Sequence, residues 1–225
     1  MDKVETVWRY FCSCLPLSHA CEDDMEFDKQ KQERGVLLVG GAGSLGAAIT
    51  ARLKNVSTRK YVPFRFDVDV PNDVAGGVFI HGSTLDAGSI AYACETSNAP
   101  VVVHLAGWNQ SHFDCREKSR TDFFKLNIQG TFVLLSTLCK LSVKKFLYIS
   151  SPSVLDPSSV SGWACLTCET MVRHFAASKR MKVVILRLAP CTPPYITNNY
   201  SRWCQEFWRD GVLLDDASDC VICAL

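Results

Sequence analysis

The chain has 225 residues, of which 48% are hydrophobic and 21% are charged, and its formal net charge is +1; these values are typical of a globular protein with one sizeable domain or two small ones. The near-neutral charge, without a concentrated basic block, excludes a general electrostatic affinity for nucleic acid. No apolar run reaches the roughly 18 residues that a membrane-spanning helix needs, and the N-terminus lacks the charge order of a signal peptide, so we expect a cytoplasmic location.

Residues 1–34 are predicted to be an extension that precedes the folded domain. Apolar residues from Val4 to Leu15 share one face of a helix, whereas residues 22–34 form a charged linker with little to bury. We favour a short docking helix or a disordered segment here. Acylation of the nearby cysteines, with peripheral attachment to a membrane, is the alternative.

A glycine-rich turn opens the folded part of the chain. Val36 to Val39 has the unbroken apolar character of a strand buried on both faces, and an apparent helix begins soon afterwards. Gly40, Gly43 and Gly46 lie between them. Glycines at this spacing let the chain turn sharply, let the backbone approach a ligand, and let the helix pack close to the sheet. The pattern predicts a diphosphate at the start of the helix.

An acidic residue ends the next predicted strand. Residues 61–66 form that strand and Asp67 follows it. A carboxylate at this place would accept hydrogen bonds from the adenosine ribose and repel a 2′-phosphate, which favours NAD over NADP as the cofactor. Arg65 leaves NADP open. The alternative is that the glycines form only a tight turn and that Asp67 is only a strand-end residue.

Strands and helices then alternate along the chain, which predicts an α/β fold with a Rossmann-type, doubly wound, mostly parallel sheet covered on both faces. The remaining predicted strands are residues 78–81, 101–107, 144–149 and 183–188, and the predicted helices are residues 87–97 and 162–178. Between the fourth and fifth strands lies an amphipathic helix, whose buried face is predicted to hold Phe124, Ile128, Phe132 and Leu135.

Several motifs in this order resemble the extended short-chain dehydrogenase/reductase superfamily, which includes the NAD-dependent epimerases and dehydratases. The motifs are the glycine turn, Asp67, residues 82–86 (Gly-Ser-Thr-Leu-Asp), residues 103–107 (Val-His-Leu-Ala-Gly), Asn127-x-x-Gly-Thr131 and residues 143–154. The last motif and the position of Asp67 are most similar to the 3β-hydroxysteroid dehydrogenase branch. The resemblance covers residues 35–190, which we take as the NAD(P)-binding domain.

The resemblance implies a bound NAD, a sterol or similar alcohol as substrate, and pairing of two copies through the helices after the fourth and fifth strands. Ser151 would hold a substrate oxygen. The residues implied to line the cofactor are Gly40, Ala42, Gly43, Ser44, Leu45 and Gly46 at the diphosphate, Asp67 at the ribose, Leu85 and Asp86 at the adenine edge, and Leu105, Ala106 and Gly107 at the middle of the cofactor.

Several of these positions also have simple structural interpretations. Asp86 serves equally well as a helix N-cap, and Asn127 as a polar residue near a helix kink. Ser150 and Ser151 could form a turn at the end of a strand. His104, on an apolar strand, is interpreted as a core histidine without a catalytic role.

The catalytic residues of the superfamily are missing from their expected place. In the family, a tyrosine takes up the proton of the substrate alcohol, and a lysine four residues later lowers the pKa of that tyrosine. Aligning Glu169 with the family's acidic position places Ser161 at the tyrosine and Cys165 at the lysine. We therefore expect impaired catalysis or a different base. The alternatives are a non-enzymatic cofactor-binding or scaffold protein and a shortened form of an active enzyme.

Residues 191–225 are predicted to be a short remnant of the substrate-binding region, so the substrate lobe would be largely missing. Residues 203–208 carry an aromatic helical stripe that must be buried against the domain or a partner. The chain also has 12 cysteines, including the Cys-x-x-Cys pairs 165/168 and 220/223. We interpret them as free thiols and expect no metal site, because the two pairs are distant in sequence and the first lies in a predicted helix.

Overall fold

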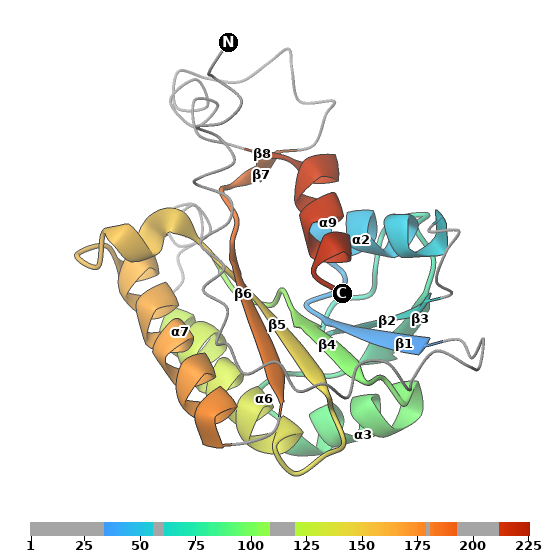
Figure 1. Cartoon of the computed structure of the whole chain (residues 1–225), viewed down its shortest axis with the longest axis horizontal. Coiled ribbons are helices and arrows are strands. Elements are labelled where there is room, and N and C mark those ends of the chain that lie inside the picture. Colours follow the sequence, from blue (N-terminus) through green and yellow to red (C-terminus); the bar gives the residue numbers. More distant parts are fainter. Residues whose placement is uncertain (1–33, 56–60, 109–119, 179–180, 193–211) are drawn as a thin grey trace, which may run out of the picture.

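The computed structural model describes residues 34–55, 61–108, 120–178, 181–192 and 212–225. Its centre is a parallel sheet of six strands in the order β3-β2-β1-β4-β5-β6, with a separate pairing of β7 and β8 (Figure 1). This order confirms the predicted Rossmann-type fold. The strands are β1 (Arg34–Val39), β2 (Tyr61–Asp67), β3 (Val78–His81), β4 (Val101–His104), β5 (Lys145–Ser150), β6 (Lys182–Arg187), β7 (Cys191–Thr192) and β8 (Val212–Leu213).

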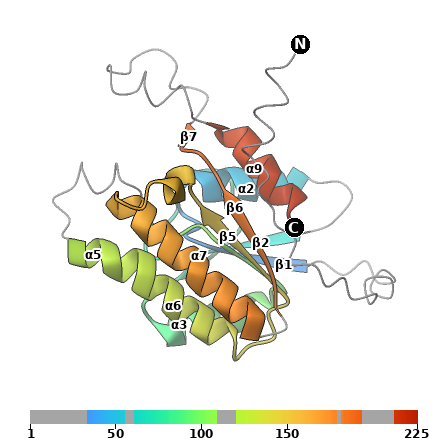
Figure 2. The ribbon, with the colours of Figure 1, turned by 60° about the vertical axis from the view of Figure 1, so that its left-hand side comes forward.

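Helices cover both faces of the sheet. On one face α2 (Ser44–Asn55) packs beside α9 (Leu214–Cys223), and on the other lie α3 (Ala87–Ser97), α6 (Gly130–Leu138) and α7 (Val160–Ser178). Figures 1 and 2 show the two helical layers with the sheet between them. The short helix α5 (Arg120–Phe124) leads through a π-helical turn, η2 (Lys125–Gln129), into α6, and the 3-10 turn η3 (Pro152–Leu155) precedes α7.

The burial of strand β1 on both faces of the sheet explains why its sequence is an unbroken apolar run. Its side chains alternate between the two faces of the sheet, so that Leu37 and Val39 enter the core under α3, α6 and α7, while Val36 and Leu38 enter the core under α2 and α9. All four side chains have no exposed surface. A parallel strand covered on both sides must be apolar at every position, which is the pattern that predicts it.

The register of the strands gathers the predicted site at one edge of the sheet. Val39 pairs with Phe66 on one side and with His104 on the other. The carboxyl ends of β1, β2 and β4 therefore lie side by side, and the change of strand order occurs between β1 and β4. In open α/β sheets this crevice is where ligands bind.

The predicted buried face of the helix after β4 is wrong at its start. Ile128 and Leu135 are buried as expected, but Phe124 and Phe132 are 45% and 50% exposed, and Phe123 is buried instead. The cause is the π-helical turn η2, which adds one residue to a helical turn. Residues five apart, such as Phe123 and Ile128, then share a face, which a spacing of three and four residues does not predict.

Helix α9 completes the layer that α2 begins. Ala217 and Val221 are fully buried against the core that Ile49 and Leu53 of α2 enter. The backbone carbonyl oxygen of Leu225 accepts a hydrogen bond from the Lys145 ammonium group at 3.2 Å. Residues 212–225 thus pack on the sheet, and the division of the chain at residue 190 remains a prediction.

Two predictions lie outside the described residues, namely the N-terminal extension with its membrane alternative and the aromatic stripe of residues 203–208. Within the described ranges, no helix is both long and apolar enough to cross a membrane. The cytoplasmic location also remains a prediction.

Candidate cofactor site

The glycine turn between β1 and α2 is packed too closely for side chains at two of its positions. Gly40 has a φ of +85°, and a Cβ atom on it would lie 2.4 Å from the backbone nitrogen of Ala106. A Cβ atom on Gly46 would lie 2.4 Å from the carbonyl oxygen of Gly41. Packing within the protein alone therefore requires glycine at both positions.

Gly43 is different, because nothing in the described structure requires it to be glycine. A Cβ atom there would lie no closer than 3.7 Å to its nearest neighbour, the carbonyl oxygen of Gly40, which is an ordinary contact. Gly43 and Ser44 are exposed on the open side of the turn. The free space over Gly43 is what a ligand lying against the backbone would fill.

The start of helix α2 can hold an anion. The N–H groups of a helix's first turn have no partners within the helix, and they form its positive end. The first turn of α2 contains no acidic residue that would neutralise this end. Ser44 and Leu45 belong to this turn, and both retain exposed surface. The turn therefore suits a phosphate group placed over Gly43.

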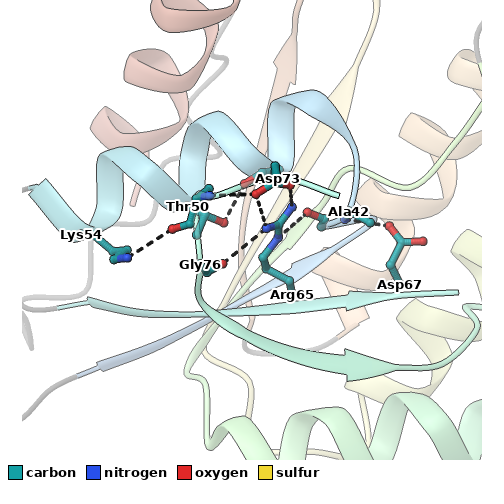
Figure 3. Close-up of polar contacts among 10 residues, drawn as sticks. Ala42, Thr50, Lys54, Arg65, Asp67, Asp73 and Gly76 are labelled. Atoms are coloured by element: carbon teal, nitrogen blue, oxygen red, sulfur yellow. Dashed lines mark hydrogen bonds and ion pairs between the residues drawn. The ribbon is translucent and has the colours of Figure 1, made fainter. Parts of the chain in front are cut away.

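Asp67 lies directly beside the turn, at the end of β2. Its Oδ2 accepts a hydrogen bond from the backbone nitrogen of Ala42 at 2.9 Å, and its Oδ1 accepts one from Val68 at 2.8 Å (Figure 3). The side chain is partly exposed. Oδ1 also accepts the backbone N–H of Asp69 at 3.3 Å, whereas Oδ2 keeps a second acceptor position, so Asp67 can receive a ribose hydroxyl group through Oδ2 while it remains attached to the turn.

Arg65 is buried beneath the turn and is not available to a ligand. Its Nε donates to the carbonyl oxygen of Gly41 at 2.7 Å, and its terminal nitrogens form a bidentate pair with Asp73 at 2.8 and 2.6 Å. The side chain of Arg65 is only 2% exposed. The sequence left NADP open because of Arg65, but this guanidinium group is already neutralised and does not face the position of a 2′-phosphate.

Strand β4 ends at His104, although the predicted strand extended to residue 107. The segment that follows β4 is nevertheless fixed by hydrogen bonds. The backbone nitrogens of Leu105 and Ala106 both donate to the carbonyl oxygen of Val39, at 2.7 and 2.9 Å. Further along, Trp108 donates its backbone N–H to Asn127 Oδ1 at 2.8 Å, and Asn127 Nδ2 donates back to the carbonyl oxygen of Trp108 at 3.0 Å. Asn127, which belongs to a family motif and was also interpreted as a polar residue near a kink, thus fixes this segment from the π-helical turn.

The two residues implied at the adenine edge differ in character. Asp86 is the N-cap of α3, and its carboxylate accepts hydrogen bonds from the backbone nitrogens of Gly88 and Ser89 at 3.0 and 3.2 Å. These bonds, with a further one from the Ser89 hydroxyl group, lower the pKa of Asp86. The capping interpretation is confirmed. Leu85 is 42% exposed at the same edge.

Ser151, Ser161 and Cys165, which the resemblance assigns to the family's catalytic positions, come together in the structure. Burial raises the pKa of the Cys165 thiol to about 11, although hydrogen-bonding contacts with the Ser151 backbone and the Ser161 side chain act in the opposite direction. The thiol is therefore neutral at pH 7 and supplies no positive charge. Ser151 caps η3, where its Oγ accepts a hydrogen bond from the backbone nitrogen of Ser153 at 3.2 Å. The arrangement offers hydroxyl groups but no base activated by a cation.

His104 is a core histidine, as predicted. Its side chain is buried beside Tyr148, with ring centroids 5.6 Å apart, and burial lowers its pKa to about 4. Nε2 lies 2.9 Å from the hydroxyl oxygen of Thr131. Nδ1 has no hydrogen-bond partner within the described structure. The ring is neutral and points into the core.

A buried carboxylate that sequence reasoning did not place ties α7 to the ends of two strands. Glu169 is fully buried and accepts hydrogen bonds from Ser150 at 2.8 Å, from Arg187 at 2.8 Å to each oxygen, and from Arg173 at 2.9 Å. Desolvation alone would raise the pKa of Glu169, but the arginine and serine donors lower it overall. The sequence used Glu169 only to align the family's acidic position and did not reveal its arginine partners.

The described structure shows no group of three or more histidine, cysteine or acidic side chains that could hold a metal ion. Cys165, Cys168, Cys220 and Cys223 are free thiols.

Curated relatives of this chain are nucleotide-sugar enzymes. The human protein named dTDP-D-glucose 4,6-dehydratase is 27% identical over 132 residues, which are 55% of this chain and 37% of that protein. A probable dTDP-glucose 4,6-dehydratase from Sinorhizobium fredii is 30% identical over 109 residues, or 45% of this chain and 31% of its own length. The matched part therefore spans little more than a third of these relatives at most.

Solved structures agree with the fold. A short-chain dehydrogenase/reductase superfamily protein from Agrobacterium tumefaciens with bound NAD has a TM-score of 0.61 at 25% identity, covering 71% of this chain and 50% of that one. A UDP-glucose 4-epimerase from Thermotoga maritima with UDP-glucose also has a TM-score of 0.61 at 25% identity, covering 71% of this chain and 57% of that one.

These comparisons do not support the hydroxysteroid branch, because both curated relatives and the Thermotoga maritima structure are named for nucleotide sugars. The model described as the NAD dependent epimerase/dehydratase family matches residues 36–207 of the 225. The chain belongs to the NAD-dependent epimerase/dehydratase family.

Proposed function

We propose that residues 35–190 form an NAD-binding unit, and that this chain binds the cofactor without the tyrosine and lysine pair that the family pattern uses for proton transfer. The observation that carries the proposal is the space over Gly43, a glycine that packing within the protein does not require. It lies at the positive end of α2 and next to Asp67. A diphosphate with an attached ribose fits this combination.

The residues that would hold NAD are those of the turn and of the neighbouring strand ends. Bound NAD supplies a hydride acceptor. Asp67 would receive the adenosine ribose, since its carboxylate is partly exposed beside the turn. The diphosphate would lie against Gly43, Ser44 and Leu45, and Leu85, Leu105, Ala106 and Gly107 would contact the rest of the cofactor.

The chemistry proposed for this chain is limited by α7. Ser161 and Cys165 stand at the tyrosine and lysine positions, and the Cys165 thiol is neutral at pH 7 because burial raises its pKa to about 11. We therefore favour a protein that uses NAD as a ligand, in sensing or as a scaffold. The second candidate is an oxidoreductase acting on nucleotide sugars, with Ser151 and Ser161 holding the substrate oxygen; it is favoured by the names of the relatives.

A titration with NADH tests both candidates. Energy transfer from the tryptophans of the protein to bound NADH is expected to give a saturable signal, and absence of saturation would reject the proposal. Turnover is then measured as conversion of UDP-glucose or dTDP-glucose to a chromatographically distinct product, since epimerisation and dehydration regenerate NAD, and as NADH formation with a 3β-hydroxysterol. Binding without turnover supports the ligand role, whereas turnover of a sugar nucleotide supports the second candidate. Turnover of the sterol alone would restore the hydroxysteroid interpretation.

Asp67→Asn is expected to change cofactor preference. Removing the charge weakens hydrogen bonds to the ribose hydroxyls and removes the repulsion of a 2′-phosphate, so the ratio of NAD affinity to NADP affinity should fall about tenfold or more. Calorimetric titration of both cofactors measures this ratio. Asp69→Asn, which removes the same charge from an exposed neighbour, is the control. Equal losses for NAD and NADP would contradict the assignment of Asp67 to the ribose.

We also propose that two copies pair through α5, α6 and α7, which lie side by side in Figure 2. This surface exposes Phe124 and Trp163, whose rings stack at 6.4 Å, and Phe132, at 50% exposure. Exposed aromatic residues gathered on one surface are typical of an interface. Trp163→Glu is expected to halve the mass measured by light scattering, while Tyr92→Glu on α3 leaves it unchanged. A monomeric wild-type protein would contradict the pairing.

A further inference from the structure

Arg65 lies at the centre of a buried polar cluster beneath the glycine turn (Figure 3). It extends from β2, and every nitrogen of its guanidinium group is engaged. Nε donates to the Gly41 carbonyl oxygen, one terminal nitrogen donates to Asp73 and to the Gly76 carbonyl oxygen at 3.4 Å, and the other donates to Asp73. A buried guanidinium group is costly to desolvate unless it is paired in this way.

Two residues of β2 form hydrogen bonds with a single peptide group of the turn. Arg65 binds the carbonyl oxygen of Gly41, and Asp67 binds the N–H of Ala42, at 2.7 and 2.9 Å. These two atoms belong to the same planar peptide unit, so fixing both of them fixes the plane. Arg65 and Asp67 are two residues apart on a strand and point to the same face of the sheet. The Gly43 N–H donates to the Gly40 carbonyl oxygen at 3.4 Å, so the N–H groups that face the proposed diphosphate are those from Ser44 onward.

The same arginine holds the loop between β2 and β3. The Asp73 carboxylate accepts hydrogen bonds from both terminal nitrogens of Arg65. It also accepts one from the backbone N–H of Ala75 at 2.9 Å. The hydrogen bond with Arg65 is the main cause of the lowered pKa of Asp73. Lys54 of α2 adds a hydrogen bond to the carbonyl oxygen of Ala75 at 3.3 Å. Strand, loop and turn are thus joined through one side chain.

We propose that Arg65 is a positioning residue for the diphosphate: by holding the Gly41 carbonyl oxygen, it orients the N–H groups of the turn toward the cofactor. The inference rests on the proposed NAD-binding function. Asp73 has a different part, since it neutralises the buried guanidinium group and anchors the loop without touching the turn. The two residues therefore affect different measurable quantities when they are replaced.

Arg65→Lys tests the proposal. A lysine keeps the charge but cannot bind Gly41 and Asp73 together with its single ammonium group. The affinity for ADP, which carries the diphosphate, is expected to fall about tenfold or more, while the affinity for adenosine, which lacks it, stays within about twofold. Equal losses for the two ligands, or no loss for ADP, would overturn the proposal. If the wild-type protein binds neither ADP nor NADH, it is the proposed function that fails.

Asp73→Asn is the matched variant. Its amide oxygen still accepts from Arg65 and the Gly41 contact is retained, so the melting temperature is expected to fall while the affinity for ADP stays within about twofold of the wild type. A loss of ADP affinity as large as that of Arg65→Lys would refute the assignment to the Gly41 contact, because only the loop anchor has been weakened.

A measurement on the wild-type protein covers the case in which Arg65→Lys does not fold. The Arg65 Nε–H resonance is expected to be protected from hydrogen exchange and to shift when ADP binds, because its acceptor belongs to the turn. Arg52 provides the control, since it binds Asp219 at 3.1 Å on the exposed side of α2, away from the turn. An Arg65 resonance that is insensitive to ADP in a protein that binds ADP would overturn the proposal.

Discussion

Gly43→Ala is expected to reduce NAD affinity by about 100-fold or more without harming the fold. The added methyl group would occupy the space in which the cofactor's diphosphate lies against the backbone, and a loss of this size corresponds to about 3 kcal/mol. Within the protein the new Cβ atom would meet nothing closer than 3.7 Å. Because alanine has fewer conformations than glycine in the unfolded chain, the free energy of unfolding should rise by about 0.4–1 kcal/mol. Titration with NADH and denaturation in urea measure the two effects.

Gly46→Ala is the matched control for this prediction. Its Cβ atom would lie 2.4 Å from the carbonyl oxygen of Gly41, so this variant must lose stability. If Gly43→Ala raises the free energy of unfolding and Gly46→Ala lowers it, then packing requires glycine at position 46 but not at position 43, where only a ligand would require it. If Gly43→Ala bound NADH as tightly as the wild type, the diphosphate would not lie over this turn.

Glu169→Ala is expected to lower the free energy of unfolding by about 2–3 kcal/mol, because it removes the acceptor of a buried hydrogen-bond network and leaves the partly exposed Arg187 and Arg173 without a counter-charge. Glu169 is fully buried, and its two carboxylate oxygens accept hydrogen bonds from Arg187, Arg173 and Ser150. The change would separate α7 from the ends of β5 and β6. Urea denaturation followed by circular dichroism measures the loss.

The exposed pair of Arg52 and Asp219 provides the control. Its side chains are 42% and 55% exposed, so Asp219→Ala should cost no more than about 1 kcal/mol of the free energy of unfolding.

The pH dependence of the free energy of unfolding gives a second check on Glu169. Because the pKa of Glu169 is lowered in the folded protein, its contribution is fully present above the unfolded value of about 4.3 and is lost as the pH falls through the folded pKa. The stability difference between wild type and Glu169→Gln should therefore shrink in acid, and a difference independent of pH would contradict the ionised state.

The sheet and the glycine turn could be predicted because their signals are local. An apolar run such as residues 36–39, followed by glycines and a helix, specifies a buried parallel strand and its turn within a few residues of sequence. The cap at Asp86 is equally local, since a carboxylate bonds to backbone nitrogens two and three residues later. Residues 161–165 contain neither tyrosine nor lysine, and the assignment of Ser161 and Cys165 to the family's catalytic positions remains a prediction.

The rest depends on contacts between distant residues. Arg65 looked like a candidate for a 2′-phosphate because nothing in the sequence shows that Asp73 folds back over it and takes its charge. The exposed position of Phe124 follows from a π-helical turn, which no spacing rule includes. The substrate branch was misjudged for a related reason: short motifs around the cofactor describe what binds NAD, and they do not describe the substrate.

The packing of α9 beside α2 has a consequence for the order of events during synthesis. The core under these helices brings Val36 and Leu38 of the first strand together with Ala217 and Val221, which follow all six strands of the sheet in sequence. A nascent chain that has been made only as far as β6 has α2 on this face of the sheet but leaves the part that α9 covers exposed. Contacts over such a separation form late and expose apolar surface in the meantime. Chaperones that bind apolar surface should therefore hold the nascent chain on the α2 side until α9 has emerged from the ribosome.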